Sequence, residues 1–418
     1  MQRVLRRAEL AELAGLFFLH GMALGAWFVP LGQVLDTHGL QVIKPFAFAA
    51  SATAALVSPL FFGAMADRHL APIHVLRLLA LANAGATALT ATAIARAHGP
   101  WIVLACIQLQ ALCIAPTWGI SCSIVFSRLQ NPARQFGPVR SLGTLGWMAG
   151  CWLVSALRAD SSTLSGFCDA ALWLGLGLFT WLLPATTPDA SARPTTLRER
   201  MGLDALGLLK ERDHRVVFFT TALFAIPVAA FYPFAPTQLR ELGLERTAAW
   251  MTLGQITEMA AMLALPALLA RWRLKWILLT GLSFGLIRYV LCALDGKGWV
   301  LAGVSLHGFA FTLLFITVQV YLDQRVPPAW RTRAQALFSL MQSGVGNLLG
   351  YLGTGWWMSA CQTPTGTDWR RYWGGLAAVV AFVWIYFLVA YRGQASQRAR
   401  AGGAAMARVE PRDVHPDG

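Results

Sequence analysis

The sequence predicts an all-α membrane protein with twelve transmembrane helices in two six-helix halves. Three observations support this prediction. Hydrophobic residues make up 56% of the 418 residues and charged residues only 13%, which is about half the charged share of a soluble domain. Apolar runs long enough to cross a bilayer recur along the chain. One polar stretch, residues 186–214, divides these runs into two sets of six.

The predicted spans follow one another with short polar connections. They lie at residues 11–35, 43–66, 73–96, 100–126, 139–159, 166–185, 215–238, 247–270, 274–294, 298–322, 333–358 and 371–391. Each is long enough to cross as a helix, which satisfies every backbone polar group within lipid. We therefore assign 1–185 to an N-terminal half, 186–214 to a central cytoplasmic loop, 215–391 to a C-terminal half and 392–418 to a disordered cytoplasmic tail.

Basic residues are unevenly divided between the two faces of this layout. The termini and the even-numbered loops carry 24 of the 34 Lys and Arg, and the odd-numbered loops carry eight. Cytoplasmic loops of membrane proteins are enriched in Lys and Arg, so both termini are predicted to be cytoplasmic. The net charge of +14 is spread between apolar runs instead of forming one patch. We therefore expect a lipid bilayer, and no nucleic acid, as the surroundings of this chain.

The residue types found within the spans argue against enzymatic chemistry. The seven Cys form no CxxC pair, so we expect reduced core residues and no metal site. Cys168 and Cys361 both fall near the predicted outer face, which leaves a pairing between them open. No G-x-x-x-x-G-K-[ST] motif is present, so ATP-driven pumping is not expected. We expect no cofactor and no enzyme, because one central acid and distant His residues do not form a catalytic set.

The connection after the second span carries a recognisable motif. Its sequence, Gly63-Ala-Met-Ala-Asp67-Arg68, resembles the G-x-x-x-D-R element of the major facilitator superfamily. In that superfamily the acid sits at a helix end and the Arg braces neighbouring helices. Six plus six spans with a long central cytoplasmic loop is also the layout of that superfamily. The resemblance implies a structural role for Gly63, Asp67 and Arg68.

Five further stretches resemble the bacterial nucleoside:proton symporters of this superfamily, and they occur in the same order across both halves. They are Arg128-Leu-Gln-Asn131, Pro138-Val-Arg-Ser-Leu-Gly-Thr-Leu-Gly146, Leu203-Asp-Ala205, Gln255-Ile-Thr-Glu258 and Pro328-Ala-Trp-Arg-Thr-Arg-Ala-Gln335. The resemblance implies a monomeric importer in the bacterial inner membrane that carries a nucleoside and a proton by alternating access. Symporters of sugars or aromatic acids share this layout, so these cargoes, a uniporter and a membrane sensor remain alternatives.

Matching motifs carry the substrate contacts of the family onto seven positions of this chain, which are Arg140, Thr144, Trp147, Gln255, Glu258, His307 and Phe311. Tyr232 and Thr312 stand at two further contact positions of the family and complete a set of nine predicted substrate contacts. This chain departs from the family pattern in two spans. Thr312 stands where the family has a second acid after the aromatic residue of the tenth span. Ala229 and Tyr232 stand where the seventh span of the family supplies amides.

Glu258 is informative on physical grounds alone. It lies near the centre of the eighth predicted span, roughly 18 Å from either surface at the rise of a helix. An ionised carboxylate costs about 3 kcal/mol at that depth, so it must face a polar cavity, meet a cation or stay protonated. We predict a proton carrier, and an acid that bonds neighbouring helices is the alternative. Gln255 shares its helical face, either to contact a ligand or to orient the carboxyl.

Two further stripes suggest a cavity for an aromatic polar solute. Arg140, Thr144 and Trp147 recur at i, i+4 and i+7 on one helical face and combine a guanidinium, a hydroxyl and an indole. Arg140 also lies near the cytoplasmic end, where a topological role is equally consistent. His307 and Phe311 are one turn apart, and Phe311 either stacks on a base or packs in the core.

Three other residues within the spans have more ordinary explanations. His20 and Trp27 form a pair at i and i+7 in the first span, and a core histidine with satisfied hydrogen bonds is the favoured interpretation of His20. Arg288 lies in the outer half of the ninth span. We expect it to snorkel or to pair with a loop acid such as Asp295.

Overall fold

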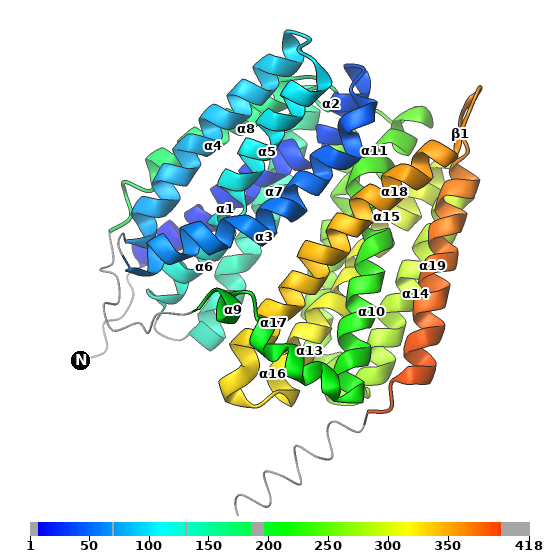
Figure 1. Ribbon diagram of the computed structural model, residues 1–418. Helices are drawn as coiled ribbons and strands as arrows, with labels where there is room; N and C mark the ends of the chain where they lie inside the picture. The colour runs from blue at the N-terminus through cyan, green and yellow to red at the C-terminus, as the bar shows by residue number, and fades with distance from the viewer. Residues whose placement is uncertain (1–6, 69–70, 130–131, 185–195, 394–418) are drawn as a thin grey trace, which may run out of the picture.

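The computed structural model describes residues 7–68, 71–129, 132–184 and 196–393, and long helical rods run between its two ends (Figure 1). The described residues form twelve such rods. By length and composition, eight of these rods are able to cross a membrane, and residues 41–57 and 164–179 form shorter apolar helices. The sequence-based prediction of an all-helical membrane fold is confirmed.

The first six rods come from the N-terminal half of the chain. They are α1 (Arg7–Phe28) with α2 (Leu31–Thr37), α3 (Lys44–Arg68), α4 (Pro72–Ala95), α5 (Pro100–Ile114) with α6 (Thr117–Phe126), α7 (Pro132–Ala156) and α8 (Leu164–Phe179). A short turn, η1 (Gln41–Ile43), precedes α3. Pro30 and Pro116 stand at the breaks inside the first and fourth rods, because proline removes a backbone donor that a continuous helix needs.

The last six rods come from the C-terminal half. They are α10 (Arg212–Val228) with α11 (Phe231–Glu241), α12 (Thr247–Met251) with α13 (Leu253–Arg271), α14 (Leu274–Ala293), α15 (Lys297–Phe311) with η3 (Thr312–Ile316) and α16 (Thr317–Arg325), α17 (Arg331–Ser339) with η5 (Leu340–Gly346) and α18 (Asn347–Ala360), and α19 (Trp369–Ala390). Both η3 and η5 are π-helical turns. The turn η4 (Pro328–Trp330) precedes α17, and the strands β1 (Gln362–Thr363) and β2 (Gly366–Thr367) pair antiparallel before α19.

Part of the predicted central loop is ordered into short helical turns. Residues 185–195 lie outside the described part of the chain, and α9 (Leu197–Arg200) and η2 (Leu203–Lys210) follow them. The loop contacts the C-terminal half, because Arg333 of α17 forms a salt bridge with Glu199 at 3.0 Å. Gly202 has a φ of +68° and leaves no room for a Cβ beside the backbone of α17. The exact boundaries of the two halves and of the tail stay predictions.

The two halves form separate helical bundles that meet along one interface (Figure 1). In the first, α1 packs along α7, and α4 packs along α8; in the second, α14 packs against α15 and α19. Glycine allows the α1–α7 crossing to be close. A Cβ added at Gly21 would lie 1.9 Å from the Gly143 carbonyl oxygen, and one at Gly146 would lie 2.0 Å from that of Phe18. Small residues permit such backbone approach in membrane bundles.

The start of α1 and the end of α19 lie at the same end of the molecule (Figure 1). The opposite end is called the distal end below. Among the described residues, eight hydrogen bonds join the two halves there, mostly between α2 or the start of α3 and α11, and between the end of α7 and α12. The pairs are Gln33–Pro236, Asp36–Thr237, Thr37–Arg240, Lys44–Pro233, Lys44–Thr237, Trp152–Thr252, Ser155–Ala249 and Asp160–Ala248. The halves are therefore closed against each other at the distal end.

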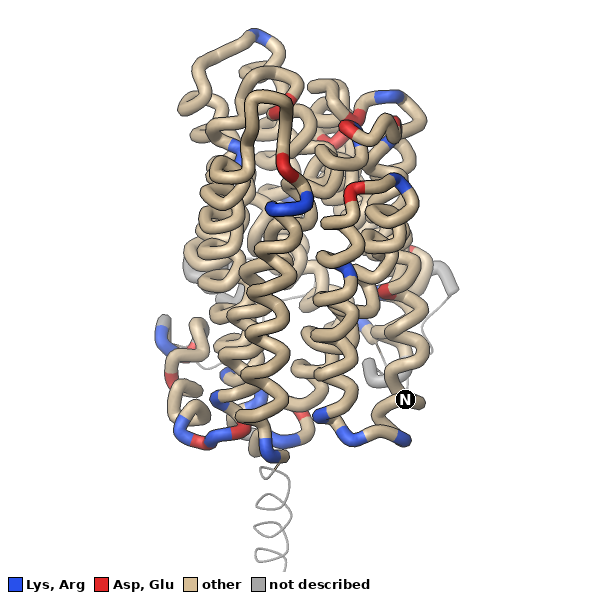
Figure 2. Tube along the Cα trace, turned by 90° about the vertical axis from the view of Figure 1, so that its right-hand side faces the viewer, with Lys and Arg blue, Asp and Glu red and all other residues tan. Residues whose placement is uncertain are grey.

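Charged residues gather at the two ends of the molecule, and the band between them is nearly free of charge (Figure 2). This distribution is what a bilayer requires, because an exposed charge at its centre is costly. The G-x-x-x-D-R element lies on the end of α3, which stays helical to Arg68. The predicted structural loop is therefore a helix end at Gly63, Asp67 and Arg68, and the side chains of these residues lie outside the described part.

Candidate functional site

A central cavity of about 390 Å³ lies between the two halves, within the size range of small-molecule sites. Eight of the nine predicted substrate contacts line it, and Thr312 does not. The lining residues are Gly21, Leu24, Phe28, Trp118, Arg140, Gly143, Thr144, Trp147, Val228, Ala229, Tyr232, Gln255, Glu258, His307, Phe311, Gln342, Asn347 and Tyr351. This cavity is called the central cavity below.

The α7 stripe faces the central cavity as its helical spacing predicts. The close α1–α7 crossing places Gly143 against α1, and Arg140, Thr144 and Trp147 line the cavity. The Arg140 guanidinium lies 5.6 Å from the centre of the Trp118 ring, within the range of a cation–π contact. The Trp147 indole N–H has no hydrogen-bond partner among the described residues. Arg140 therefore reaches the cavity, and Trp147 brings an unused donor to it.

Glu258 lines the central cavity from α13, and its backbone packs tightly against α15. A Cβ at Gly308 would lie 2.0 Å from the Glu258 nitrogen, so only glycine permits this separation of the two helices. Both Glu258 and Arg140 are described, and no salt bridge joins them. Arg140 still exerts an electrostatic attraction on the carboxyl. The cavity thus holds a carboxyl and a guanidinium that face a common space without direct pairing.

Gln255 lies one turn before Glu258 and is held by the facing rod. Its Nε2 donates a hydrogen bond to the Tyr232 hydroxyl at 3.0 Å. Its Oε1 is buried and has no partner within the described residues, so this acceptor is unsatisfied. The Tyr232 ring in turn contacts Phe28 and Trp147, with ring centroids 5.2 and 6.0 Å away. An amide oxygen is therefore available to a ligand beside an aromatic wall.

His307 is oriented by a buried arginine. Arg288 of α14 donates a hydrogen bond to His307 Nδ1 at 2.5 Å, which leaves Nε2 of the neutral ring to carry the hydrogen. The His307 ring stacks on Phe231 with centroids 4.0 Å apart. The expected snorkelling or pairing of Arg288 is corrected, because its side chain is buried and also donates to the Tyr289 hydroxyl. Asp295 instead accepts a hydrogen bond from Gln238.

Phe311 and Thr312 are neighbours in sequence with different surroundings. Phe311 lines the central cavity and lies 6.0 Å from the His307 ring. Thr312 is fully buried, and its hydroxyl donates to the backbone oxygen of Glu258 at 3.4 Å. Thr312 begins the π-helical turn η3, and it faces α13 rather than the cavity. The structure therefore does not place the predicted substrate contact Thr312 at the site.

Sequence reasoning missed one whole wall of the cavity. Asn347 and Tyr351 of α18 line it, together with Gln342 of η5. Asn347 and Tyr351 are spaced i and i+4, with Ser343 one turn earlier, and this polar stripe in the eleventh span was the available signal. The π-helical turn η5 changes the register before Asn347, and sequence periodicity does not predict such a turn.

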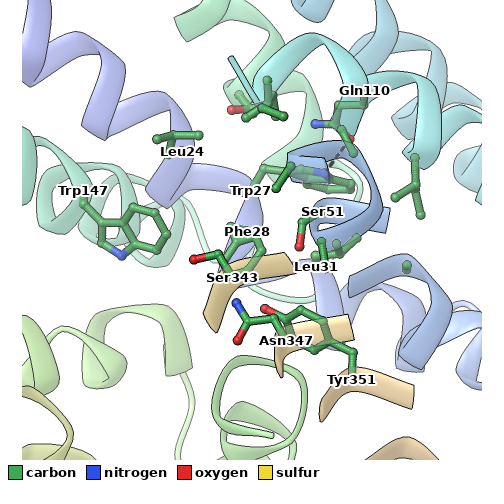
Figure 3. Close-up of a pocket in the computed structure, with 18 residues that line it drawn as sticks. Leu24, Trp27, Phe28, Leu31, Ser51, Gln110, Trp147, Ser343, Asn347 and Tyr351 are labelled. Atoms are coloured by element: carbon green, nitrogen blue, oxygen red, sulfur yellow. Dashed lines mark hydrogen bonds between the residues drawn. The ribbon is translucent and has the colours of Figure 1, made fainter. Parts of the chain in front are cut away.

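A second cavity, of about 330 Å³, adjoins the first and is called the side chamber below (Figure 3). Leu24, Phe28, Trp147, Asn347 and Tyr351 line both cavities. The side chamber extends between α1, α3 and α5, and its wall is largely apolar. Its polar lining residues are Ser51, Gln110, Asp169, Ser343 and Asn347.

Other candidate residues have structural roles. His20 is fully buried, with Nδ1 3.0 Å from Ser121 Oγ and Nε2 3.0 Å from Thr117 Oγ1, as favoured for a satisfied core histidine. All seven cysteines are free, so Cys168 and Cys361 do not pair. The described residues contain no group of three His, Cys, Asp or Glu side chains able to hold a metal ion.

Two helical bundles around a cavity lined by ionisable side chains define a membrane transporter of the major facilitator type. The comparisons with known proteins agree. Residues 9–396 match the family model described as Nucleoside H+ symporter. The chain is 31% identical over 402 residues to the putative nucleoside transporter YegT of Escherichia coli (strain K12), covering 91% of this chain and 93% of that protein.

Two further similarities extend over nearly the whole chain. The nucleoside permease NupG of Escherichia coli (strain K12) is 27% identical over 403 residues, covering 90% of this chain and 94% of that protein. A crystal structure of a mutant of the nucleoside transporter NupG is 24% identical and has a TM-score of 0.85, covering 92% of this chain and 100% of that one. The protein belongs to the nucleoside:proton symporter family, and it is a transporter, not an enzyme.

Proposed function

We propose that this protein imports a nucleoside together with protons across the bacterial inner membrane by alternating access. One observation carries the proposal. Glu258, Arg140 and Gln255 come from both halves of the fold and face one cavity between them. A site formed by two halves that close at one end is what alternating access requires. The family match and the nucleoside-transporter relatives support this cargo class.

The central cavity offers the contacts that a nucleoside needs. Arg140 and the Trp147 indole N–H supply donors, and the free Gln255 Oε1 supplies an acceptor. These groups match the carbonyls, ring nitrogens and hydroxyls of a base and a ribose. Phe311 and Tyr232 present aromatic rings for stacking, an interaction that every base accepts. Because one chain supplies the whole cavity, we propose that the monomer is the transport unit.

Glu258 is proposed as the proton carrier. Its carboxyl faces the cavity without a hydrogen bond or a salt bridge among the described residues. In the protonated form it is neutral and free of Arg140. After it releases the proton, its charge is attracted to the Arg140 guanidinium across the cavity. Proton binding thus changes the attraction between the two halves, which links the proton to the conformational change.

The closed distal end defines the conformational state. The 24-to-8 division of Lys and Arg assigns both termini to the cytoplasm, so the distal end faces outward. The hydrogen bonds between α2 and α11 then form the outer closure. We infer an inward-facing state, in which the central cavity exchanges solute and protons with the cytoplasm.

The test is nucleoside uptake into proteoliposomes that hold purified protein. A membrane potential of about 100 mV supplies ~2.3 kcal/mol per proton, enough for roughly fifty-fold accumulation. We expect uridine or adenosine to accumulate, a protonophore to abolish accumulation, and Glu258→Gln to lower the accumulation ratio. Glu245→Gln changes an exposed loop acid and is the matched control. If Glu258→Gln concentrates substrate at the rate of the unmodified protein, the proton assignment fails.

Competition experiments resolve the cargo alternatives that the sequence left open. The assay measures counterflow uptake of a labelled nucleoside, and unlabelled nucleosides, sugars and aromatic acids are added one at a time as competitors. A nucleoside site predicts competition by nucleosides alone, and a sugar or aromatic-acid symporter predicts competition by its own cargo. A uniporter equilibrates solute without concentrating it, and a sensor binds solute but carries no label across.

A further inference from the structure

A second carboxyl is buried in the membrane domain, at the wall of the side chamber. Asp169 of α8 is 1% exposed and lines this chamber. Neither carboxyl oxygen has a hydrogen-bond partner of normal geometry within the described residues, and no salt bridge to it is present there. A buried carboxylate without a cation is costly, so this group requires a proton for neutrality.

A chain of donors leads from the chamber wall toward Asp169. The Trp27 indole N–H donates to Gln110 Oε1 at 3.0 Å (Figure 3). Gln110 Nε2 in turn donates to Thr87 Oγ1 at 2.8 Å. Thr87 lies beside the Asp169 carboxyl, as does the Trp173 indole. Because the Thr87 oxygen already accepts a hydrogen bond, its own hydrogen is free to point at Asp169. Trp27, on the chamber wall, is therefore linked to this carboxyl through Gln110 and Thr87.

Within the described part of the chain, the neighbouring elements supply no positive charge to Asp169. From α1, His20 lies near Trp173, with ring centroids 5.2 Å apart, and its two nitrogens are engaged by α6. On α8 itself, Cys168 is the adjacent titratable group. From α4, Arg77 bonds Thr180 at the other end of α8, and α5 contributes the neutral Gln110. The protonation of Asp169 is therefore set by its access to water and not by a neighbouring cation.

The position of Asp169 suits a group that meets both sides of the membrane in turn. It lies on the second turn of α8, which begins at the distal end, and Leu31, the first residue of α2, lines the same chamber. The side chamber that it lines adjoins the central cavity. In the inward-facing state Asp169 therefore lines space that continues toward the cytoplasm, and its carboxyl oxygens lie buried in the wall of that space. Opening of the α2–α11 contacts would bring the outer solution to the same wall.

We propose that Asp169 is a second proton carrier, so that two protons accompany each nucleoside, one on Glu258 and one on Asp169. This proposal rests on the proposed function. In the outward-facing state the carboxylate takes a proton from the outer water. In the inward-facing state the carboxylic acid releases that proton to the cytoplasmic water. No other bond forms or breaks. The two acids lie in opposite halves of the fold.

The experiment measures the accumulation of labelled nucleoside under a gradient of one pH unit with the membrane potential clamped at zero. Each proton contributes about a factor of ten per pH unit. We expect about 100-fold accumulation for the unmodified protein and about tenfold for Asp169→Asn, with counterflow exchange retained. Glu245→Gln, an exposed acid, should keep the value of the unmodified protein. Thr87→Val removes the neighbouring hydroxyl and should shift the pH dependence of uptake.

The outcomes separate this proposal from the proposed function. Accumulation of about tenfold by the unmodified protein means one proton per nucleoside and overturns the role of Asp169 while leaving symport intact. Accumulation of about 100-fold by Asp169→Asn overturns it as well. If Asp169→Asn does not fold, the ratio measured for the unmodified protein still decides between one proton and two. Absence of gradient-driven accumulation by the unmodified protein refutes the proposed function itself.

Discussion

Gly308 of α15 lies directly against the backbone nitrogen of Glu258 in α13. A methyl group at residue 308 would be 2.0 Å from that nitrogen and 2.2 Å from the Gly254 carbonyl oxygen, far inside contact distance. The same contact sets how Glu258 faces the central cavity and how α15 presents His307. The position of the proposed proton carrier thus depends on the absence of one side chain on the neighbouring helix.

The substitution Gly308→Ala should therefore separate α13 from α15. We expect it to destabilise the protein by about 1–3 kcal/mol, the usual cost of overpacking, and to reduce uptake severely. The control is Gly298→Ala on the same helix, where an added methyl group meets no atom within 4 Å. It should leave both the stability and the uptake rate unchanged. Thermal unfolding in detergent and uptake in proteoliposomes measure the two effects. Equal behaviour of the two variants would contradict the packing argument.

Some residues of the site can be predicted from the sequence, and others can be identified only from the packing of the helices. Arg140 and Trp147 are predicted by the family motif that contains them, and their helical spacing supports the prediction because it places them on one face. Glu258 was found because an acid at mid-membrane is costly. Asp169 lies near a helix end in sequence, where acids are ordinary, and only the packing of α8 shows that it is buried beside a cavity.

Other features depend on contacts that no local pattern encodes. Arg288 looked like a residue of the outer half with access to a loop acid, and the fold turns it inward to His307. Asn347 reaches the cavity after a π-helical turn that is invisible to periodicity. The twelve rods were predictable because hydrophobic length decides them. The residues on their inner faces were only partly predictable, because tertiary packing decides the rotation of each rod.

The contact between Arg288 and His307 predicts a loss of affinity without a loss of fold. Arg288→Met replaces a buried cation, for which the described residues show no acidic partner, by an apolar side chain of similar length. Removing a buried charge without an acidic partner also removes its desolvation cost, so we expect the fold to be retained. His307 loses the donor that fixes its Nε2–H, so we expect nucleoside binding to weaken by about tenfold, the equivalent of one hydrogen bond.

Tyr289→Phe is the matched control for this variant. It removes the other hydrogen bond of Arg288 and leaves the bond to His307 in place. Equilibrium binding of labelled nucleoside should be near normal for Tyr289→Phe and weakened for Arg288→Met, with similar unfolding temperatures. A Tyr289→Phe variant with the same loss of affinity would show that general packing, and not the orientation of His307, sets the binding strength.

The outer closure depends on a buried lysine. Lys44 Nζ lies 2.6 Å from Asp36 Oδ2 and also donates to Pro233 and Thr237 of α11. Removing the negative partner of a buried charge costs about 3–5 kcal/mol. Because α11 covers Lys44 only while the distal end is closed, this loss destabilises the closed state alone. Asp36→Asn should therefore shift the population toward the outward-facing state.

Cysteine labelling measures that shift. Ser51 lines the side chamber on α3, so Ser51→Cys should react with a membrane-impermeant maleimide from the outside only when the distal end opens. We expect at least a tenfold faster reaction when Asp36→Asn is added, and no change with Glu245→Gln, which removes an exposed acid on the same side. An unchanged rate in the Asp36→Asn background would show that the Lys44 contacts do not hold the closure.

The buried thiol of Cys361 should react slowly with maleimide at neutral pH. Cys361 follows α18 in the turn before α19 and is 1% exposed, and burial raises the pKa of its thiol. Only the thiolate reacts with maleimide. A raised pKa leaves less thiolate at neutral pH, so the reaction should be slow at pH 7 and accelerate about tenfold per pH unit until the pKa is passed. Thr365→Cys, exposed in the same turn, should react quickly.

The same variant tests the orientation of the protein in the membrane. If both termini are cytoplasmic, the turn before α19 faces outward, and an impermeant maleimide should reach Thr365→Cys in intact cells. Labelling only after permeabilisation would place this turn in the cytoplasm and reverse the assigned orientation.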